Sequence, residues 1–180
     1  LPVEPEARLR LVKACMRANQ ARLIDRFPAY KKLAELARWC GEHCEAFGYV
    51  TDQFVVDILV WYHLAWLGET VRRSDARVRQ LMERGGGYSL HDRRTLMTVI
   101  GELLSGVIDR YARLAKEGKI EISVTPYAHP IVPLLLDLRA AREAMPEMPL
   151  PQLGAYPGGA ERADWHLREA VNTCQQYFGF

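Results

Sequence analysis

Apolar residues recur at helical spacing along the first half of the chain. Between residues 6 and 27 they follow one another three or four positions apart, and a similar stripe begins after Pro28 and continues to Cys40. A proline inside such a pattern ends one helix and starts the next. We therefore expect two helices, over residues 6–27 and 28–40, followed by a turn near Gly48.

The segment QFVVDILVWYHLAWLG, which follows Asp52, is apolar on nearly every side. It is too long for a single strand, and a helix that is apolar all round must be buried all round. No other segment in the first half is large enough to surround it. We therefore expect a buried helix whose packing partners lie partly outside the chain.

Capping signals predict two more helices. Ser74 is a candidate N-cap for a short helix that ends at the triple glycine, residues 85–87. Ser89 together with Asp92 resembles a capping box, which would start a long helix. Gly118 is the expected left-handed residue that ends this helix.

One segment, KIEISVT at residues 119–125, has the alternation of apolar and polar residues that is typical of a strand. A lone strand leaves its backbone groups unpaired, and no other segment offers it a partner. Two further helices are expected, over residues 130–145 and 160–178, separated by a loop rich in proline and glycine. The order helix, strand, helix is typical of a βα barrel or a doubly wound sheet.

Composition excludes several classes of function. Of the 180 residues, 49% are hydrophobic and 26% are charged, as in ordinary soluble globular proteins. A net charge of +2 provides no basic stripe for nucleic acid, and the longest apolar run is too short to cross a membrane. Four cysteines are too few for a disulfide scaffold, so a reduced, cytoplasmic protein is expected. The chain lacks an initial Met and ends soon after a helix, so we expect both ends to be cut points.

The weaker candidates for chemistry have simple structural explanations. Cys40, His43 and Cys44 occur together in CGEHC, but a structural zinc site needs a second ligand pair, which the sequence lacks. No phosphate-binding loop, serine elbow or metal-ligand motif is present, so no cofactor and no metal is expected. Asp57 falls in the apolar helix, where polar groups commonly bond nearby backbone. His166 falls on a helix face and is expected to be solvated.

The strongest functional signal is the sequence PYAHP after the predicted strand. Active sites of α/β barrels and doubly wound sheets gather at the carboxyl ends of parallel strands, which is where Tyr127 and His129 occur. The prolines restrict the backbone, tyrosine offers a flat face for a sugar or base, and histidine offers a donor, an acceptor or a proton. The structural alternative is that His129 caps the next helix or bonds a buried carbonyl, and position alone leaves both open.

The same region resembles a known family. The run GKIEISVTPYAHPIVPLLLD is similar to the second signature region of glycoside hydrolase family 57, whose members process α-glucans. NQARLIDRFPAYKKLAELA, VDILVWYHLAWLGE and YARLAKEGKI occur in the family's usual order, and ADWHLREAVNTCQQYFGF resembles the helix before its nucleophile strand. One departure is Ala128, where many members carry a second aromatic residue, so one stacking contact to the sugar lacks its side chain.

The resemblance implies a distorted (β/α)7 barrel and a retaining mechanism, with a glutamate nucleophile and an aspartate acid/base. Neither carboxylate maps onto residues 1–180, because the family's first signature would precede Leu1 and its nucleophile motif would follow Phe180. The chain would then be part of one catalytic barrel domain, incomplete at both ends. This piece would be mainly helical with one clear strand, would lack catalytic residues of its own, and would be inactive alone.

By this resemblance, Tyr127 and His129 would line the sugar-binding cleft. Trp61 and Trp66 are further candidates that would support the cleft from behind, although aromatic residues at helical spacing more often pack in a core. Glu121 is another candidate, because inward-facing strand residues in a barrel can be polar near the site. The expected partner is an α-glucan or oligosaccharide, and an oligomeric or swapped neighbour would cover the apolar faces of the piece.

Two alternatives from other classes remain. A non-catalytic helical interaction module would use the VWYHLAWLG face to dock a partner helix. A metal-dependent barrel deacetylase would need an Asp-Asp or His-x-x-x-His ligand set, which the sequence does not contain. The sequence also leaves hydrolysis, glucan transfer and branching open as the reaction.

Overall fold

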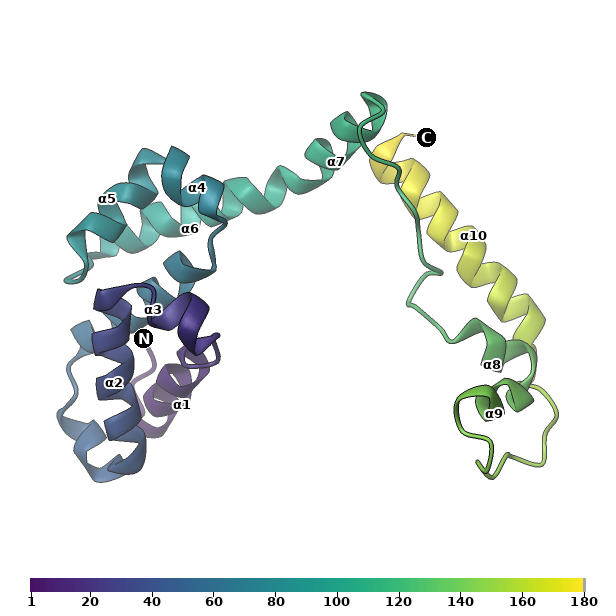
Figure 1. The fold of residues 1–180 in the computed structure, drawn as a ribbon, viewed down its shortest axis with the longest axis horizontal. Helices are drawn as coiled ribbons and strands as arrows, with labels where there is room; N and C mark the ends of the chain where they lie inside the picture. The colour runs from purple at the N-terminus through teal and green to yellow at the C-terminus, as the bar shows by residue number, and fades with distance from the viewer. Residues whose placement is uncertain (180) are drawn as a thin grey trace. The chain divides into compact units, whose positions relative to one another are not determined.

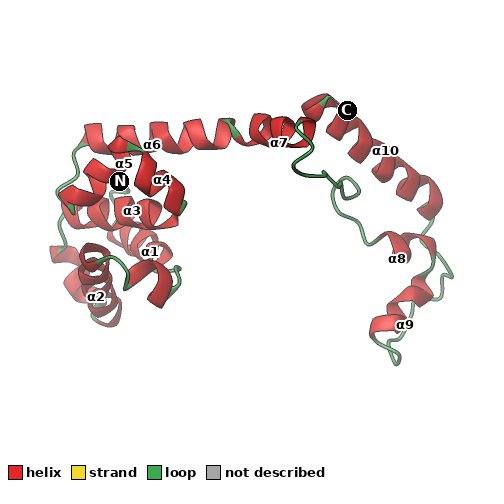
Figure 2. Ribbon diagram, turned by 45° about the horizontal axis from the view of Figure 1, so that its top comes forward, coloured by secondary structure: helices red, strands yellow, loops and turns green. Residues whose placement is uncertain are grey.

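The computed structural model describes residues 1–179 and their side chains, apart from the side chain of Cys44. Helices and loops make up this part of the chain, and no strand occurs in it (Figure 1, Figure 2). The chain divides into two compact units, Leu1–Leu103 and Leu104–Phe180. None of the helices within residues 1–179 has both the length and the apolar character needed to cross a membrane.

The first unit is built from helices α1 to α5 and most of α6. Their bounds are α1 Pro5–Cys15, α2 Pro28–Glu42, α3 Asp52–Trp66, α4 Glu69–Ser74, α5 Ala76–Arg84 and α6 Leu90–Ser105. A π-helical turn, η1 (Gln20–Ile24), and a 3-10 turn, η2 (Cys44–Tyr49), lie on either side of α2. The single helix predicted over residues 6–27 is wrong, because Asn19 accepts a hydrogen bond from the Arg22 N–H at 2.9 Å and begins a new turn.

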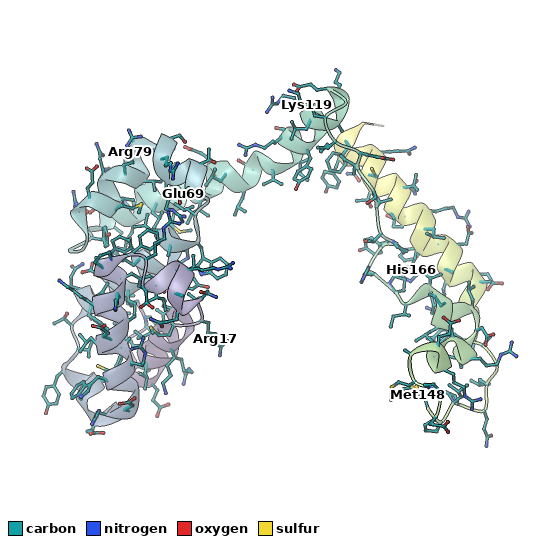
Figure 3. The ribbon with its side chains drawn as sticks, viewed as in Figure 1. Arg17, Glu69, Arg79, Lys119, Met148 and His166 are labelled. Atoms are coloured by element: carbon teal, nitrogen blue, oxygen red, sulfur yellow. The ribbon has the colours of Figure 1, made fainter. Side chains whose placement is uncertain are left out.

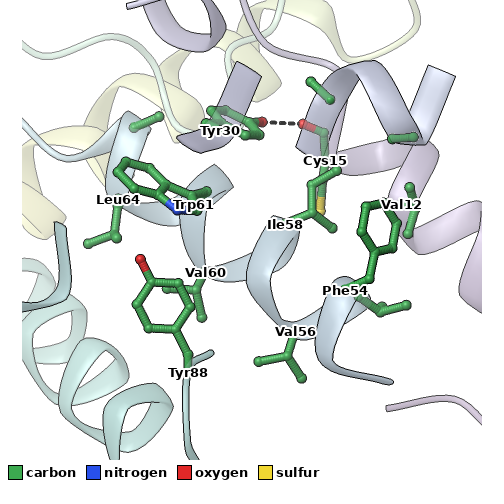
Figure 4. Packing of buried hydrophobic residues seen from close by; sticks show 14 of the residues in the cluster. Val12, Cys15, Tyr30, Phe54, Val56, Ile58, Val60, Trp61, Leu64 and Tyr88 are labelled. Carbon is green, nitrogen blue, oxygen red and sulfur yellow. Dashed lines mark hydrogen bonds between the residues drawn. The ribbon is translucent and has the colours of Figure 1, made fainter. Parts of the chain in front are cut away.

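Helix α3 is the centre of the core of this unit (Figure 4). Helices α1 and α2 pack against it, and Tyr88, Leu96 and Val99 join the same apolar cluster. The expectation that its partners lie partly outside the chain is therefore wrong. Complete burial of each large apolar side chain contributes about 1.5–3 kcal/mol, so α3 is the main stabilising element of the unit. Its buried residues are Phe54, Val55, Val56, Ile58, Val60, Trp61, Leu64 and Ala65.

The polar side chains of α3 bond the backbone of the glycine turn. The Asp57 carboxylate accepts hydrogen bonds from the N–H groups of Gly87 at 2.9 Å and Tyr88 at 3.1 Å. The Trp61 indole N–H donates to the carbonyl of Gly85 at 2.9 Å. Gly85 has a φ of 74°, in the left-handed region where glycine meets no Cβ clash. This arrangement confirms the structural explanation given above for Asp57.

The predicted capping box of α6 is confirmed. The backbone N–H of Asp92 donates to the Ser89 hydroxyl at 3.2 Å, and the N–H of Ser89 donates to the Asp92 carboxylate at 2.8 Å. The cap of α5 is not the predicted Ser74, which ends α4, but Asp75, whose carboxylate accepts from the Arg77 N–H at 2.9 Å. Both residues are good N-caps, and the acidic one is favoured by the positive end of the helix dipole.

The second unit begins within α6 and contains α7 Val107–Lys116, α8 Val132–Leu136, η3 Leu138–Ala140, α9 Ala141–Ala144 and α10 Gly159–Phe178. The predicted long helix is divided at Gly106, which lies between α6 and α7, and Gly118 has the expected positive φ of 67° after α7. The helix predicted over residues 130–145 is divided too, because the Asp137 side chain accepts from the N–H of Arg139 and starts η3.

The second unit has few buried side chains. The three buried residues of α10 are small: Gly159, Ala163 and Ala170. The C-terminal part of the predicted long helix leaves its apolar side exposed. The exposed residues on this part are Leu104, Val107, Ile108 and Tyr111.

Residues 119–125, predicted as a strand, form a loop. Hydrogen bonds hold its two ends: Lys119 donates to the carbonyl of Leu114 at 2.9 Å, and Tyr127 donates to the carbonyl of His166 at 2.9 Å. A strand exists only where a neighbouring backbone supplies its hydrogen bonds, and no part of residues 1–179 pairs with this segment as a ladder. The structure therefore does not show the predicted strand or the barrel that it implied.

The start of α10 generates the first prediction, because Gly159 lies directly against the backbone of α8. An added Cβ would lie 1.7 Å from the carbonyl oxygen of Leu135. Gly159→Ala should therefore push α8 and α10 apart and lower the free energy of unfolding by about 1–3 kcal/mol. Thermal unfolding of the full-length protein, followed by circular dichroism, measures this effect.

Gly101→Ala is the matched control, because its methyl group would meet no atom within 4 Å. Alanine is the better helix former by about 0.8–1 kcal/mol, so this variant should be slightly more stable. Equal melting temperatures for the two variants would contradict the close approach at Gly159.

The cap of α5 generates a prediction about pH. Hydrogen bonds from Arg77 lower the pKa of Asp75 from 3.8 to about 2 in the folded protein. The folded state therefore holds this proton less tightly than the unfolded state. The resulting stabilisation is complete above pH ~4 and is lost as the pH falls through about 2.

Asp75→Asn keeps an oxygen that can cap α5 but removes the charge. We expect the variant to be less stable than the unsubstituted protein at neutral pH, and this difference should shrink as the pH approaches about 2. Urea unfolding across this pH range measures it. A difference that does not change with pH would show that the charge of Asp75 has no role.

Candidate functional site

The PYAHP loop, residues 126–130, lies beside α10 in the second unit. The Tyr127 side chain is 48% exposed, and His129 is also exposed. An open pocket of about 500 Å³ lies between this loop and α10. The two residues predicted from the sequence therefore meet at one accessible pocket. Its polar and aromatic lining includes Ser123, Thr125, Tyr127, His129, Thr173, Cys174 and Tyr177.

The loop turns sharply at Ala128 and His129. Their φ angles of 57° and 52° lie in the left-handed region, which residues with a Cβ rarely adopt. The N–H of His129 donates to the carbonyl of Pro126 at 2.9 Å, and a positive φ at the third position of such a turn is typical of type II. Each left-handed residue costs about 1–2 kcal/mol, so other contacts must hold this conformation.

These contacts come from His166, which Figure 3 labels on α10. The N–H of Tyr127 donates to the backbone carbonyl of His166 at 2.9 Å. The His166 ring nitrogen Nδ1 lies 2.7 Å from the carbonyl oxygen of Tyr127. Because a carbonyl oxygen can only accept, Nδ1 must carry the proton and donate it. Both backbone polar groups of Tyr127 are thus bonded to a single residue that lies 39 positions later.

Trp165 adds ring contacts at the same place. Its indole lies edge-on to Tyr127, with ring centres 5.7 Å apart, and edge-on to His166 at 4.9 Å. Edge-to-face packing is a favourable geometry for aromatic pairs. The expectation that His166 is solvated is wrong, since it is half-buried and hydrogen bonded. The spacing of residues along α10 did not indicate that His166 would bond the loop, because its hydrogen-bond partner, Tyr127, is distant in the sequence.

The other predicted residues do not join this pocket. Glu121 is exposed and lines a different pocket, which also contains Arg113 and Lys116. Trp61 is 3% exposed and packs against Phe27 in the core of the first unit, with ring centres 5.6 Å apart. Trp66 also belongs to the first unit, where it is 57% exposed.

The lining of this pocket lacks the groups that cleave a glycosidic bond. No carboxylate lines it among the described residues, whereas a general acid and a nucleophile would each need one. Two carboxylates with a strongly lowered pKa, Glu69 and Asp75, lie in the first unit, where hydrogen bonds from arginines lower the pKa of each to about 2. Such groups stay ionised at neutral pH and stabilise the helices that carry them.

No metal-binding arrangement is seen either. Within the described part of the chain, His, Cys, Asp and Glu do not gather in groups of three or more that could hold an ion. Cys40 is buried, and His43 stacks on Trp39 with ring centres 4.7 Å apart. The side chain of Cys44, the last of the three candidate ligands in CGEHC, is not among those that the structure describes.

Comparison with known families gives one match. Residues 17–180 match the model of a family described as glycosyl hydrolase family 57. This range includes the PYAHP loop, α10 and all of the helices that pack around α3 except α1. No curated protein and no solved structure shows significant similarity to the chain.

The left-handed turn generates a prediction. Ala128→Gly removes the Cβ that opposes the positive φ, while it adds about 0.5–1 kcal/mol of unfolded-state entropy. The net effect should be neutral to about 1 kcal/mol stabilising, measured by thermal unfolding of the full-length protein. Ala112→Gly, within α7, is the control and should destabilise by about 1 kcal/mol. Equal destabilisation by both substitutions would contradict the strained turn.

Proposed function

The chain belongs to glycosyl hydrolase family 57, and from this premise we propose that it is the sugar-binding part of an enzyme that acts on α-glucans. One observation carries the proposal: Tyr127 and His129 lie at one accessible pocket, on a turn that α10 holds in place. Binding residues are commonly presented on loops that a rigid element supports.

The chemistry of the pocket suits a neutral, polyhydroxylated ligand. The Tyr127 ring offers a flat apolar face of the kind that packs against a pyranose ring, and its hydroxyl can donate and accept. His129 and Thr125 can hydrogen bond to sugar hydroxyls. No Lys, Arg, Asp or Glu lines the pocket within the described part of the chain, so it has no charge to attract an ionic ligand. An α-glucan is uncharged and matches this lining.

The proposal divides the reaction between this chain and other segments of the enzyme. A retaining glycosidase needs two carboxyl groups about 5 Å apart, and the pocket provides neither. The catalytic carboxylates would therefore come from segments outside residues 1–180, within the same catalytic domain. The exposed apolar residues of α7 support this proposal, because the rest of a barrel or a neighbouring copy would cover them.

The alternative of a non-catalytic interaction module is not favoured. Its docking face would be the VWYHLAWLG segment of α3. In the structure, Trp61 is 3% exposed and Leu64 is fully buried, so this face already packs inside the first unit. A partner helix could reach these buried residues only if the core opened.

Alanine substitutions test the proposed binding site in the full-length enzyme. Tyr127→Ala and His129→Ala should each lower kcat/KM on soluble α-glucans about tenfold, as expected for the loss of one good contact. The melting temperature should change little, because both side chains are exposed. Steady-state kinetics and thermal unfolding on the same preparations measure the two effects.

His91→Ala is the control, because His91 is also an exposed histidine but lies on α6 in the first unit. It should leave kcat/KM unchanged. Unaltered kinetics of His129→Ala together with a large fall in melting temperature would make His129 a structural residue and would refute its binding role.

A further inference from the structure

We infer that His166 is a positioning residue, which holds the Tyr127–His129 turn in its sugar-binding shape without contacting the sugar. The inference rests on the function proposed above for this turn. His166 does not line the pocket that Tyr127 and His129 share. Its ring instead bonds the backbone of the turn, so it would act on the ligand only through these residues.

The first argument is the pair of hydrogen bonds between Tyr127 and His166. One joins backbone to backbone at 2.9 Å and fixes the height of the loop along α10. The other joins the His166 side chain to the Tyr127 carbonyl at 2.7 Å and fixes the rotation of the peptide group that enters Ala128. Together, the two hydrogen bonds define the orientation of the Tyr127 backbone relative to α10, which neither bond defines alone.

The second argument is the conformation that these bonds restrain. Ala128 and His129 both have a positive φ, and the peptide that His166 bonds comes immediately before them. Without the ring donor, this peptide can rotate and the turn can relax to the commoner right-handed region. The relaxed turn would carry the His129 side chain away from its present position at the pocket.

The third argument is the place of His166 on α10. It lies three residues after Ala163 and four before Ala170, which puts all three on one face of the helix. The two alanines are buried, and their small side chains allow the rest of the unit to approach this face. His166 is therefore the long polar side chain within a stripe of small residues, directed at the loop.

The position of the donor atom gives a sharp test. Nδ1 is bonded directly to Cγ of histidine, and the amide nitrogen of asparagine is bonded to Cγ in the same way. The amide nitrogen of glutamine lies one carbon further out, closer to the place of Nε2. An Nδ1-specific bond is therefore reproduced by His166→Asn but not by His166→Gln, although both variants keep a polar amide.

The experiment compares His166→Ala, His166→Asn and His166→Gln in the full-length enzyme with a maltooligosaccharide of defined length. We expect KM to rise about tenfold in the alanine variant, which is the effect of losing one positioning hydrogen bond, while kcat changes much less. The glutamine variant should resemble the alanine variant, and the asparagine variant should retain a KM within about threefold of the unsubstituted enzyme. His91→Asn is the control and should change neither constant.

Thermal unfolding of each variant accompanies the kinetics. If His166→Ala does not fold, the comparison of asparagine with glutamine decides, because a purely structural polar role would tolerate both equally. Equal KM values for these two variants would overturn the inference. So would unchanged kinetics of His166→Ala in an enzyme that Tyr127→Ala and His129→Ala impair. Unchanged kinetics of the Tyr127 and His129 variants themselves would instead refute the proposed binding site, and the inference with it.

Discussion

Backbone N–H and C=O groups need hydrogen-bond partners, and the second unit depends on how Tyr127 meets this need. The segment between α7 and α8 has no neighbouring strand within residues 1–179, so it cannot pair as a ladder. Tyr127 finds both of its partners on His166 instead. The turn that follows, with its two left-handed residues, is possible because the peptide groups on both sides of the Tyr127 Cα are held by His166.

The two units bury apolar surface very differently. In the first unit, helices from both sides in the sequence surround α3, and an almost wholly apolar helix becomes the core. In the second unit, α7 has apolar residues at helical spacing but leaves Val107, Ile108 and Tyr111 exposed. Small buried residues of α10 take the place of a large apolar core there. The PYAHP loop is therefore held by specific polar contacts more than by hydrophobic burial.

Local signals in the sequence predicted local structure well. The Ser89–Asp92 capping box, the buried helix after Asp52 and the final helix all depend on residues close to one another in the chain. The family resemblance, carried by the PYAHP region and its flanks, agrees with the family match. Helix boundaries were predicted wrongly at two places where neighbouring residues have similar propensities. Asp75 caps α5, although Ser74 is a similar cap. Asn19 begins a new turn within a stretch whose apolar pattern predicted one continuous helix.

Contacts between distant segments could not be predicted in this way. His166 occupies an ordinary place on an amphipathic helix, and its bond to a loop 39 residues away leaves no trace in helical spacing. The prediction of a strand at residues 119–125 was wrong for a related reason. Alternation of apolar and polar residues indicates which side chains could face a core, but it does not identify the backbone that would pair with the segment.

The contact of Gly159 with α8 also sets the register of α10. Because an α-helix turns by about 100° per residue, deleting one residue between Gly159 and His166 would rotate the imidazole away from the loop. The length of the proline-rich connection before Gly159 is not constrained in this way. The contact of Gly159 with Leu135 fixes where α10 starts, whichever path the connection takes. Insertions and deletions should therefore be tolerated before Gly159 and selected against between Gly159 and His166.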